Sequence, residues 1–209
     1  MEKMKKGNRI KKVLYGTDNL AKPEAWEYVE SEKETKAFYI TFPTPIAGRN
    51  FWVLEYGGRI AAANFYASQL GQQELADQIS RFAAADTLPI QKETLVLQEA
   101  RVQLEEYFAG GRREFFLPVA LYGTDFQLED WQALCTIPYG ETRSYGELAA
   151  QIGRPKASRA VGMANHNNPI SVIVPCHRVI GAGGTLVGYG GGLDVKEALL
   201  KLEKNKNPT

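Results

Sequence analysis

The sequence predicts an α+β protein: a small amino-terminal α/β scaffold with an antiparallel sheet, followed by a mostly helical carboxy-terminal domain with a helix-turn-helix. Three observations support this class. Short runs rich in aromatic and β-branched residues recur in the first half. The pair Gly57-Gly58 separates two of them, as in a hairpin. Helix-capping sequences recur beyond residue 123.

The predicted domains are a leader at 1–36, an α+β domain at 37–119 and a second domain at 120–209. The leader is polar and lacks a sustained apolar period, so we expect it to be partly disordered or loosely attached. The elements predicted after it are strands at 37–42, 51–56 and 59–66, then helices at about 72–84 and 92–108. In the last of these, apolar residues share one face and Gly110-Gly111 ends the helix.

The second half carries clear helix signals. Two capping boxes, Thr124–Gln127 and Ser144–Glu147, each predict a helix start. Gly153 closes the second of these helices, and a further helix is predicted from Pro155 to about Asn165. This short helix pair has the form of a helix-turn-helix. A final helix is predicted with its cap at Asp194–Glu197.

Composition narrows the function classes. No apolar run approaches the roughly 20 residues that span a bilayer, so no membrane association is expected. The net charge is +1, but from Ile137 onward nine basic residues face five acidic ones, which suits phosphate binding by this half. Two cysteines and two histidines give no zinc-finger spacing, so we expect no metal site. Cys135 and Cys176 could form a disulfide, although reduced thiols in a cytoplasmic protein are the favoured interpretation.

The segment Pro175–Val179 carries the strongest chemical signal. Cys176 is followed directly by His177, after the apolar run 170–174. A thiolate is the nucleophilic form of cysteine, and a neighbouring imidazole can help to form it at neutral pH. By itself the dipeptide is equally compatible with a cysteine that only packs in the core, as we expect for Cys135.

Four motifs surround this cysteine: Ile137–Leu148, Asn168-Pro169, Ile173–Gly181 and Gly188–Leu193. Their order and spacing resemble the methylated-DNA–protein-cysteine methyltransferases, the DNA alkyltransferases that remove alkyl groups from O6 of guanine. The resemblance runs from about Thr124 to Glu203. It is looser over residues 37–123 and does not cover 1–36.

The resemblance implies a single-turnover reaction in which Cys176 accepts the alkyl group permanently. His177 would deprotonate the thiol through a water molecule, and Glu203 would orient the imidazole, as in nucleophile–base–orienter arrangements generally. Asn168 would brace the turn before the cysteine strand. No cofactor is implied, since the thioether product has no easy leaving reaction.

The implied partner is double-stranded DNA containing O6-alkylguanine, with O4-alkylthymine as a second candidate, bound by a monomer that associates with the nucleoid. The helix starting near Pro155 would enter the minor groove, and its predicted DNA contacts are Lys156, Ser158 and Arg159. The target nucleotide must leave the stack, because a buried thiol cannot reach it inside a duplex. Arg159 would fill the gap, and Tyr145 would push on the target phosphate.

The implied substrate pocket contains Tyr145, Val179, Tyr189 and Gly190. Glycines in the loop 188–192 permit close approach of the backbone to the extruded base, and a backbone N–H could donate to O6. Gly190 stands where some relatives carry serine or alanine, which would open the pocket to larger alkyl groups. Asp130 stands where many relatives carry an apolar residue, and we expect this to affect local packing.

Two other functions stay open. A lesion-recognising alkyltransferase-like protein would bind DNA without a reactive cysteine. A cysteine hydrolase would use Cys176 and His177 repeatedly and would ignore DNA.

Overall fold

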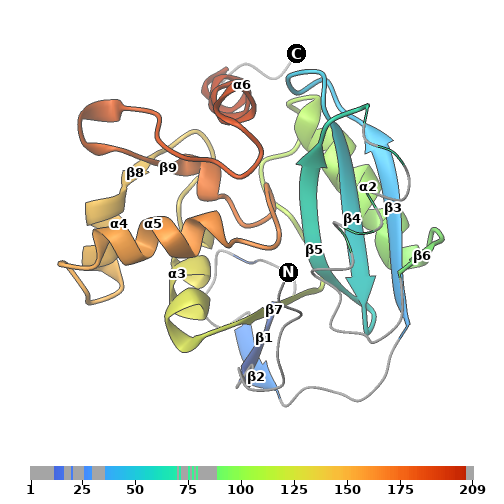
Figure 1. The fold of residues 1–209 in the computed structure, drawn as a ribbon, viewed down its shortest axis with the longest axis horizontal. Helices are drawn as coiled ribbons and strands as arrows, with labels where there is room; N and C mark the ends of the chain where they lie inside the picture. The colour runs from blue at the N-terminus through green and yellow to red at the C-terminus, as the bar shows by residue number, and fades with distance from the viewer. Residues whose placement is uncertain are drawn as a thin grey trace.

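A computed structural model describes residues 12–16, 20, 26–29, 36–69, 71, 75, 77, 79 and 89–205. In chain order its main elements are β1 (Lys12–Gly16), β2 (Trp26–Val29), β3 (Ala37–Pro43), β4 (Asn50–Tyr56), β5 (Arg59–Tyr66), β6 (Ile90–Gln91), α2 (Leu95–Phe108), β7 (Val119–Gly123), α3 (Asp125–Cys135), β8 (Arg143–Ser144), α4 (Tyr145–Gln151), α5 (Ser158–His166), η2 (Cys176–Arg178), β9 (Val179–Ile180), η3 (Ala182–Gly184) and α6 (Leu193–Lys204). Figure 1 shows the strands β3–β5 with α2 on one side of the molecule and the helices α3–α5 on the other. In the described part of the chain, no helix is long and apolar enough to cross a membrane.

Seven strands form one sheet in the order β2-β1-β7-β5-β4-β3-β6. The strands β3, β4 and β5 make the predicted antiparallel meander. Gly57 and Gly58 form its tight turn with φ angles of 61° and 74°, a region that glycine enters without a Cβ clash. Parallel pairing adds β7 beside β5 and β6 beside β3. The predicted α+β class is confirmed.

Two segments of the leader belong to this sheet. β1 pairs antiparallel with β2 and with β7, in a register that joins Lys12 to Gly123 and Gly16 to Val119. The leader was predicted to be partly disordered or loosely attached, and these two strands within it were not predicted. A local pattern could not reveal them, because their partner strand β7 lies far along the chain. The predicted domain boundary between residues 119 and 120 falls inside β7.

The helix predicted at 92–108 is α2. It begins later than predicted because Thr94 caps it, its hydroxyl accepting a hydrogen bond from the backbone N–H of Leu97 at 3.2 Å. Leu97, Leu104 and Phe108 lie on its buried face, as predicted. Of the helix predicted at 72–84, the structure describes residues 75, 77 and 79, which are helical, and the others lie outside the described residues.

Both predicted capping boxes are present. Thr124 and Gln127 bond reciprocally at the start of α3, and Ser144 and Glu147 do so at the start of α4. Gly153 follows α4 with a φ of 72°, which ends that helix as predicted. The described helices α4 and α5 pack against each other and against α3.

Two predicted helix starts are wrong. α5 begins at Ser158 instead of Pro155, because residues 155 and 156 form a turn that the bond from Ala157 N–H to the Arg154 carbonyl closes at 2.8 Å. α6 begins directly after Gly192, without a side-chain cap. Asp194, the predicted cap, already lies inside the helix and forms an ion pair with Arg49 at 3.0 Å.

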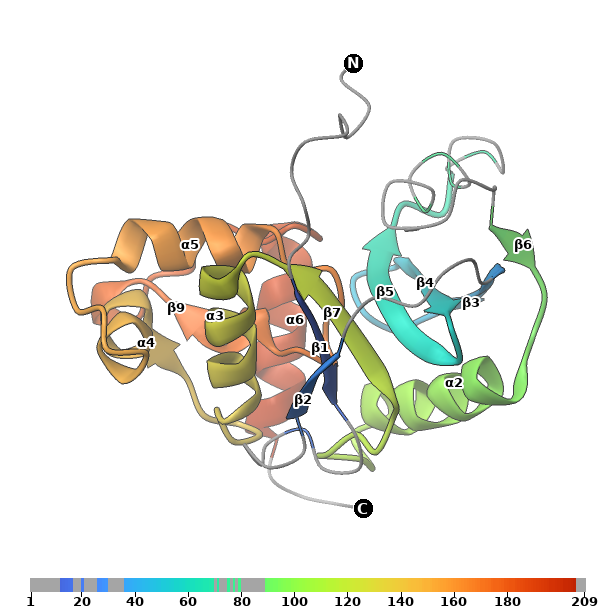
Figure 2. The same cartoon turned by 90° about the horizontal axis from the view of Figure 1, so that it is seen from below.

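The two halves of the molecule share one hydrophobic core. Its largest buried cluster includes Phe51 and Phe108 from the first half and Trp131 and Leu199 from the second. Neighbouring residues on β4 face opposite sides of the sheet: Phe51 joins this cluster, and Trp52 joins a smaller one on the other face. Figure 2 shows β7 and β1 running between the helical half and the strands β3–β5. The sheet therefore supports the elements that carry the candidate site.

Candidate active site

Cys176 opens the short 3₁₀ turn η2, and the loop before it is fastened to the edge of β5. Ala63 on β5 donates its backbone N–H to the Pro169 carbonyl at 2.9 Å, and its carbonyl accepts from the N–H of Ser171 at 2.8 Å. A parallel bridge joins Ala63 to Ile170 between these bonds. The amino-terminal sheet thus fixes the backbone that leads to the cysteine, whose side chain is only 7% exposed.

Asn168 braces the same loop from inside. Its amide nitrogen donates to the carbonyl of Val174 at 2.8 Å and to the sulfur of Cys176 at 3.2 Å, while its Oδ1 accepts from the N–H of Ile170 at 3.0 Å. One buried side chain therefore closes the loop and touches the sulfur. A donor aimed at the sulfur favours its ionised form.

Val172 holds an unusual backbone conformation within this loop. Its φ is 75°, and the N–H of Ile173 bonds the carbonyl of Ser171 across it at 3.0 Å, which makes a tight γ-turn. A β-branched residue in this region costs about 1–3 kcal/mol and persists only where the surroundings enforce it. The described surroundings do so, because Val172 is fully buried and both ends of the turn are hydrogen-bonded.

Opposing influences act on the Cys176 thiol. Burial raises its pKa to about 11, and ionised Asp130 also raises it, while the hydrogen bond from Asn168 and the charge of Lys196 lower it. Because the pKa stays above the ordinary value, the thiol is protonated at neutral pH. A reaction at this sulfur therefore needs a base.

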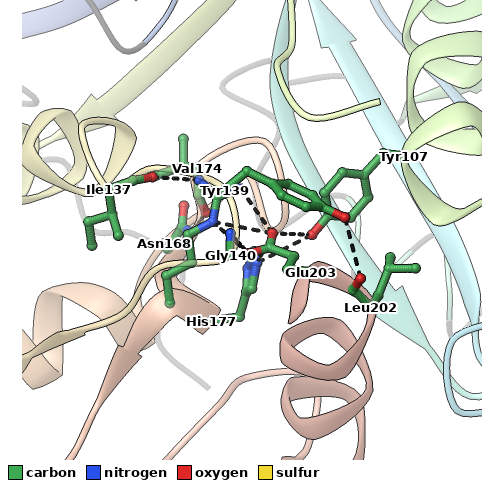
Figure 3. Close-up of polar contacts among 10 residues, drawn as sticks. Tyr107, Ile137, Tyr139, Gly140, Asn168, Val174, His177, Leu202 and Glu203 are labelled. Atoms are coloured by element: carbon green, nitrogen blue, oxygen red, sulfur yellow. Dashed lines mark hydrogen bonds and ion pairs between the residues drawn. The ribbon is translucent and has the colours of Figure 1, made fainter. Parts of the chain in front are cut away.

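His177 supplies an imidazole for that role. It is fully buried, and its Nε2 lies 2.9 Å from Oε1 of Glu203 on α6, while the Tyr107 hydroxyl donates to the same oxygen at 2.6 Å. Figure 3 shows these side chains converging on Glu203. Burial lowers the pKa of His177, against the opposing pull of Glu203, so the imidazole is neutral near pH 7.

Glu203 stays ionised despite its burial. Burial alone would raise its pKa, but His177 and Arg178 hold the pKa well below its usual range. Arg178 binds both carboxylate oxygens, with contacts of 2.9 to 3.2 Å, and its Nη1 donates to the Ile137 carbonyl at 2.6 Å. An ionised Glu203 makes Nε2 the protonated nitrogen of His177. The other nitrogen, Nδ1, has no hydrogen-bond partner in the described part of the chain and can accept a proton.

A small cavity opens onto Cys176. Its walls come from α4, α5, η2 and the glycine loop: Tyr145, Gly162, Asn165, His166, Cys176, Gly188 and Tyr189. The Tyr145 hydroxyl donates to the Val187 carbonyl at 3.1 Å, which ties α4 to the glycine loop. Burial raises the pKa of Tyr145, so this hydroxyl stays protonated.

Lys196 on α6 binds the same end of the glycine loop. It is fully buried, and its ammonium donates to the carbonyls of Val179 at 2.7 Å, Val187 at 3.0 Å and Gly188 at 3.4 Å. Burial lowers its pKa, while Cys176 raises it. Lys196 therefore joins the loop to β9 and adds positive charge near the sulfur.

The helix α5 links this cavity to the surface. Arg159 in its first turn is exposed, whereas Asn165 and His166 at its other end line the cavity. Lys156 is exposed in the turn before the helix, and Ser158 is half-buried at its start. The described part of the chain holds no cluster of side chains suited to a metal ion.

Comparison with known proteins identifies the family. Two family models match the chain: the ribonuclease-like domain of 6-O-methylguanine DNA methyltransferase over residues 37–121, and the DNA-binding domain of the same family over residues 125–205. A methylated-DNA–protein-cysteine methyltransferase of Mycobacterium leprae is 54% identical over 141 residues, which cover 68% of this chain and 84% of the relative. The chain belongs to the methylated-DNA–protein-cysteine methyltransferase family.

Solved structures of this methyltransferase family agree in fold. The O6-methylguanine methyltransferase of Mycobacterium tuberculosis matches with a TM-score of 0.67 and 45% identity over 82% of this chain and 95% of that one. The Mycobacterium tuberculosis protein in complex with DNA matches with a TM-score of 0.66 and 46% identity, covering 82% and 95% of the two chains.

The structure brings together most of the residues that the methyltransferase motifs predicted. Asn168 touches Cys176, and His177 touches Glu203. Tyr145 and Tyr189 line the cavity. Two predicted pocket residues do not: Val179 is buried and offers its carbonyl to Lys196, and Gly190 is exposed with open space around it.

Three residues of this candidate site were not predicted from the sequence: Tyr107, Arg178 and Lys196. Lys196 did leave a signal, because it falls three and four residues before Leu199 and Leu200 and so shares the buried face of α6. Arg178 stands next to His177 in the sequence, but its pairing with Glu203 depends on the fold. Tyr107 comes from the first half and gave no local sign.

Proposed function

We propose that this protein repairs DNA by transferring the alkyl group from O6 of an alkylated guanine to Cys176, once per molecule and irreversibly. Family membership supports the reaction class. The observation that carries the assignment to this thiol is its position: Cys176 lies at a small cavity, directly beside a buried His177 that an ionised Glu203 holds at 2.9 Å.

The proposed reaction begins with a proton transfer. The thiol proton of Cys176 passes, through a bridging water, to Nδ1 of His177, and Glu203 stabilises the resulting imidazolium. The sulfur then attacks the alkyl carbon in line with the bond to O6. The carbon–oxygen bond breaks as the sulfur–carbon bond forms, and its electron pair goes to the purine. The proton lost by the thiol finally resides on guanine, so the products are guanine and S-alkylcysteine.

The supporting residues act through position. Asn168 holds the sulfur and the loop before it, so Cys176 needs little rearrangement to attack. Lys196 opposes the effect of burial by favouring a negative charge on the sulfur. Tyr145 and Tyr189 form cavity walls against which a flat base can stack.

DNA would be bound along α5. We assign Arg159 to the gap that the extruded nucleotide leaves in the duplex. We assign Lys156 and Ser158 to contacts with nearby phosphates of the DNA backbone. The exposure of Arg159 and Lys156 supports this assignment. Tyr145, whose hydroxyl and ring lie near the cavity, would contact the target nucleotide as it turns out of the stack.

The proposed partner is double-stranded DNA carrying O6-alkylguanine, and O4-alkylthymine is a second candidate substrate. We propose that a monomer acts on nucleoid DNA in the cytoplasm and uses no cofactor. Residues 120–209 would carry DNA binding and alkyl acceptance, while residues 37–119 would serve as a scaffold. The bonds between Ala63 and the cysteine loop support this scaffold role.

Intact-mass measurement tests the proposal. Mixing the protein with duplex DNA that contains O6-methylguanine should add about 14 Da, one methyl group per molecule, at Cys176. Cys176→Ala should add no mass while it still binds DNA. Cys135→Ala is the matched control and should react normally, because burial raises the pKa of Cys135 to about 12 and it lies outside the cavity.

The alternatives predict other outcomes. Repeated turnover without added mass would indicate a hydrolase. Binding to the lesion without added mass would indicate a recognition protein. Either result would reject the proposed transfer.

A further inference from the structure

Asp130 is a buried acid. Its side chain is 0% exposed, and neither carboxylate oxygen has a hydrogen-bond partner in the described part of the chain. An ionised carboxylate in such a position costs several kilocalories per mole, so a buried acid of this kind takes up a proton instead. Burial accordingly raises the pKa of Asp130 to about 7.

The helix that carries Asp130, α3, packs against elements of the candidate active site. Trp131, the neighbour of Asp130, donates the indole N–H to the Ala164 carbonyl on α5 at 2.9 Å, which locks α3 against the helix that lines the cavity. The helix α3 also packs against η2, which carries Cys176. Figures 1 and 2 both show α3 beside α5. Burial is the main cause that raises the pKa of Cys176, and the charge of ionised Asp130 raises it further.

A second polar group in this region lacks partners. Asn165 on α5 is 8% exposed and lines the cavity, and both polar atoms of its amide lack partners among the described residues. An acid on α3 and an amide in the cavity wall therefore both lack hydrogen-bond partners among the described residues. Such groups are uncommon in native cores and concentrate where function outweighs packing.

The other charges near α3 do not neutralise Asp130. The titratable and charged residues on α3 and on the elements packed most closely against it are Asp125, Glu129 and Cys135 on α3, Tyr122 on β7, Tyr145 and Glu147 on α4, Arg159 and His166 on α5, and Cys176, His177 and Arg178 on η2. Arg178 is held by Glu203, Glu147 is held in its capping box, and Glu129 pairs with Arg154. Arg159 and His166 are exposed.

We propose that Asp130 is a positioning residue that acts through space on Cys176: in its neutral form it leaves the thiol free to ionise, and in its ionised form it opposes that ionisation. The proton on Asp130 would then control how readily Cys176 reacts in the neutral pH range. The consequence for DNA repair rests on the proposed function, but the effect on the thiol does not.

The test is the pH profile of Cys176 reacting with iodoacetamide, in the full chain and without DNA. Asp130→Asn keeps the shape and removes the charge. Its rate should match the wild type near pH 5.5, where Asp130 is neutral, and should be on the order of tenfold faster above about pH 8, as expected for two charges several ångströms apart at an effective dielectric constant near 20. Peptide mapping assigns the reaction to Cys176, and Cys176→Ala gives the background.

Two further variants keep the test decisive. Asp130→Leu removes the same charge with an apolar side chain and should show the same pH-dependent gain. Glu129→Gln is the matched control, since it removes an acid from the exposed side of α3 that already pairs with Arg154 at 2.8 Å, and its profile should follow the wild type. A variant-to-wild-type ratio that does not change with pH would overturn the inference.

Methyl transfer from O6-methylguanine DNA, measured on the same variants, separates this inference from the proposed function. The same pH-dependent gain in both reactions supports both. A gain with iodoacetamide in a protein that transfers no methyl group would reject the proposed function and leave the inference standing.

Discussion

Removing the charge of Asp130 should stabilise the folded protein, and increasingly so as the pH rises. The group has an ordinary pKa of 3.8 and a folded-state pKa of about 7. The native state therefore binds this proton more tightly than the unfolded state does. Between these two pKa values the free energy of unfolding falls as pH rises. The reason is that the native state is still protonated at Asp130 in this range, whereas the unfolded state has already lost the proton.

The magnitude follows from the two pKa values. Each unit of difference corresponds to 1.36 kcal/mol, so the full effect approaches about 4 kcal/mol above pH 7. Integrated between pH 5 and pH 8, the loss is about 2.5 kcal/mol in the wild type and absent in Asp130→Asn. The stability difference between the two proteins should therefore widen by about 2.5 kcal/mol over this range.

Urea unfolding at pH 5 and pH 8 measures this difference. The fluorescence of Trp131, the residue next to Asp130, should report the transition. Glu129→Gln should show no such widening, because the side chain is exposed and ion-paired. A stability difference between Asp130→Asn and the wild type that stays constant from pH 5 to pH 8 would refute the reasoning and show that Asp130 does not hold its proton in the folded state.

Three further predictions concern the relay and the DNA contacts. His177→Ala or Glu203→Gln should slow methyl transfer at neutral pH and should recover part of the loss as pH rises, since hydroxide then replaces the missing base; a loss independent of pH would point to a damaged fold. Arg159→Ala should slow repair of duplex DNA much more than reaction with free O6-benzylguanine, and less when the lesion sits in a mismatch. Equal losses of rate on duplex DNA and on free O6-benzylguanine would show that Arg159 does not act in extruding the nucleotide. Lys156→Ala should weaken binding to all DNA and lower the salt slope of binding by about one phosphate contact.

Local signals in the sequence predicted the local structure well. The two capping boxes involve residues three apart, so the printed sequence contains everything that α3 and α4 need to start. The hairpin at Gly57-Gly58 is equally local. The start of α5 was misjudged because Pro155 fits a first helical turn, but the backbone bond from Ala157 to Arg154 forms a separate turn ahead of the helix.

Contacts between distant segments could not be predicted in this way. The leader strand β1 is recognised only through β7, its partner in the sheet. Tyr107 reaches Glu203 from the other half of the molecule, and the buried pairing of Arg178 with Glu203 exists only once α6 packs against η2. The motifs indicated the candidate nucleophile, base and orienter by resemblance. The groups that determine whether these residues are ionised could be identified only from the folded structure.

Asp130 is an example of a residue whose chemical role could not be predicted from the sequence. In the sequence it is one acid among many on a helix, and its departure from the family pattern suggested only a packing change. The fold buries it without a hydrogen-bond partner among the described residues. At the Cys176 sulfur, burial and ionised Asp130 oppose ionisation, while Asn168 and Lys196 favour it. With a pKa of about 11, the resting thiol is a poor nucleophile and resists oxidation. In the proposed reaction Cys176 reacts only once. Such restraint would then be useful, because Cys176 would react only when a bound substrate and the His177 base act on it together.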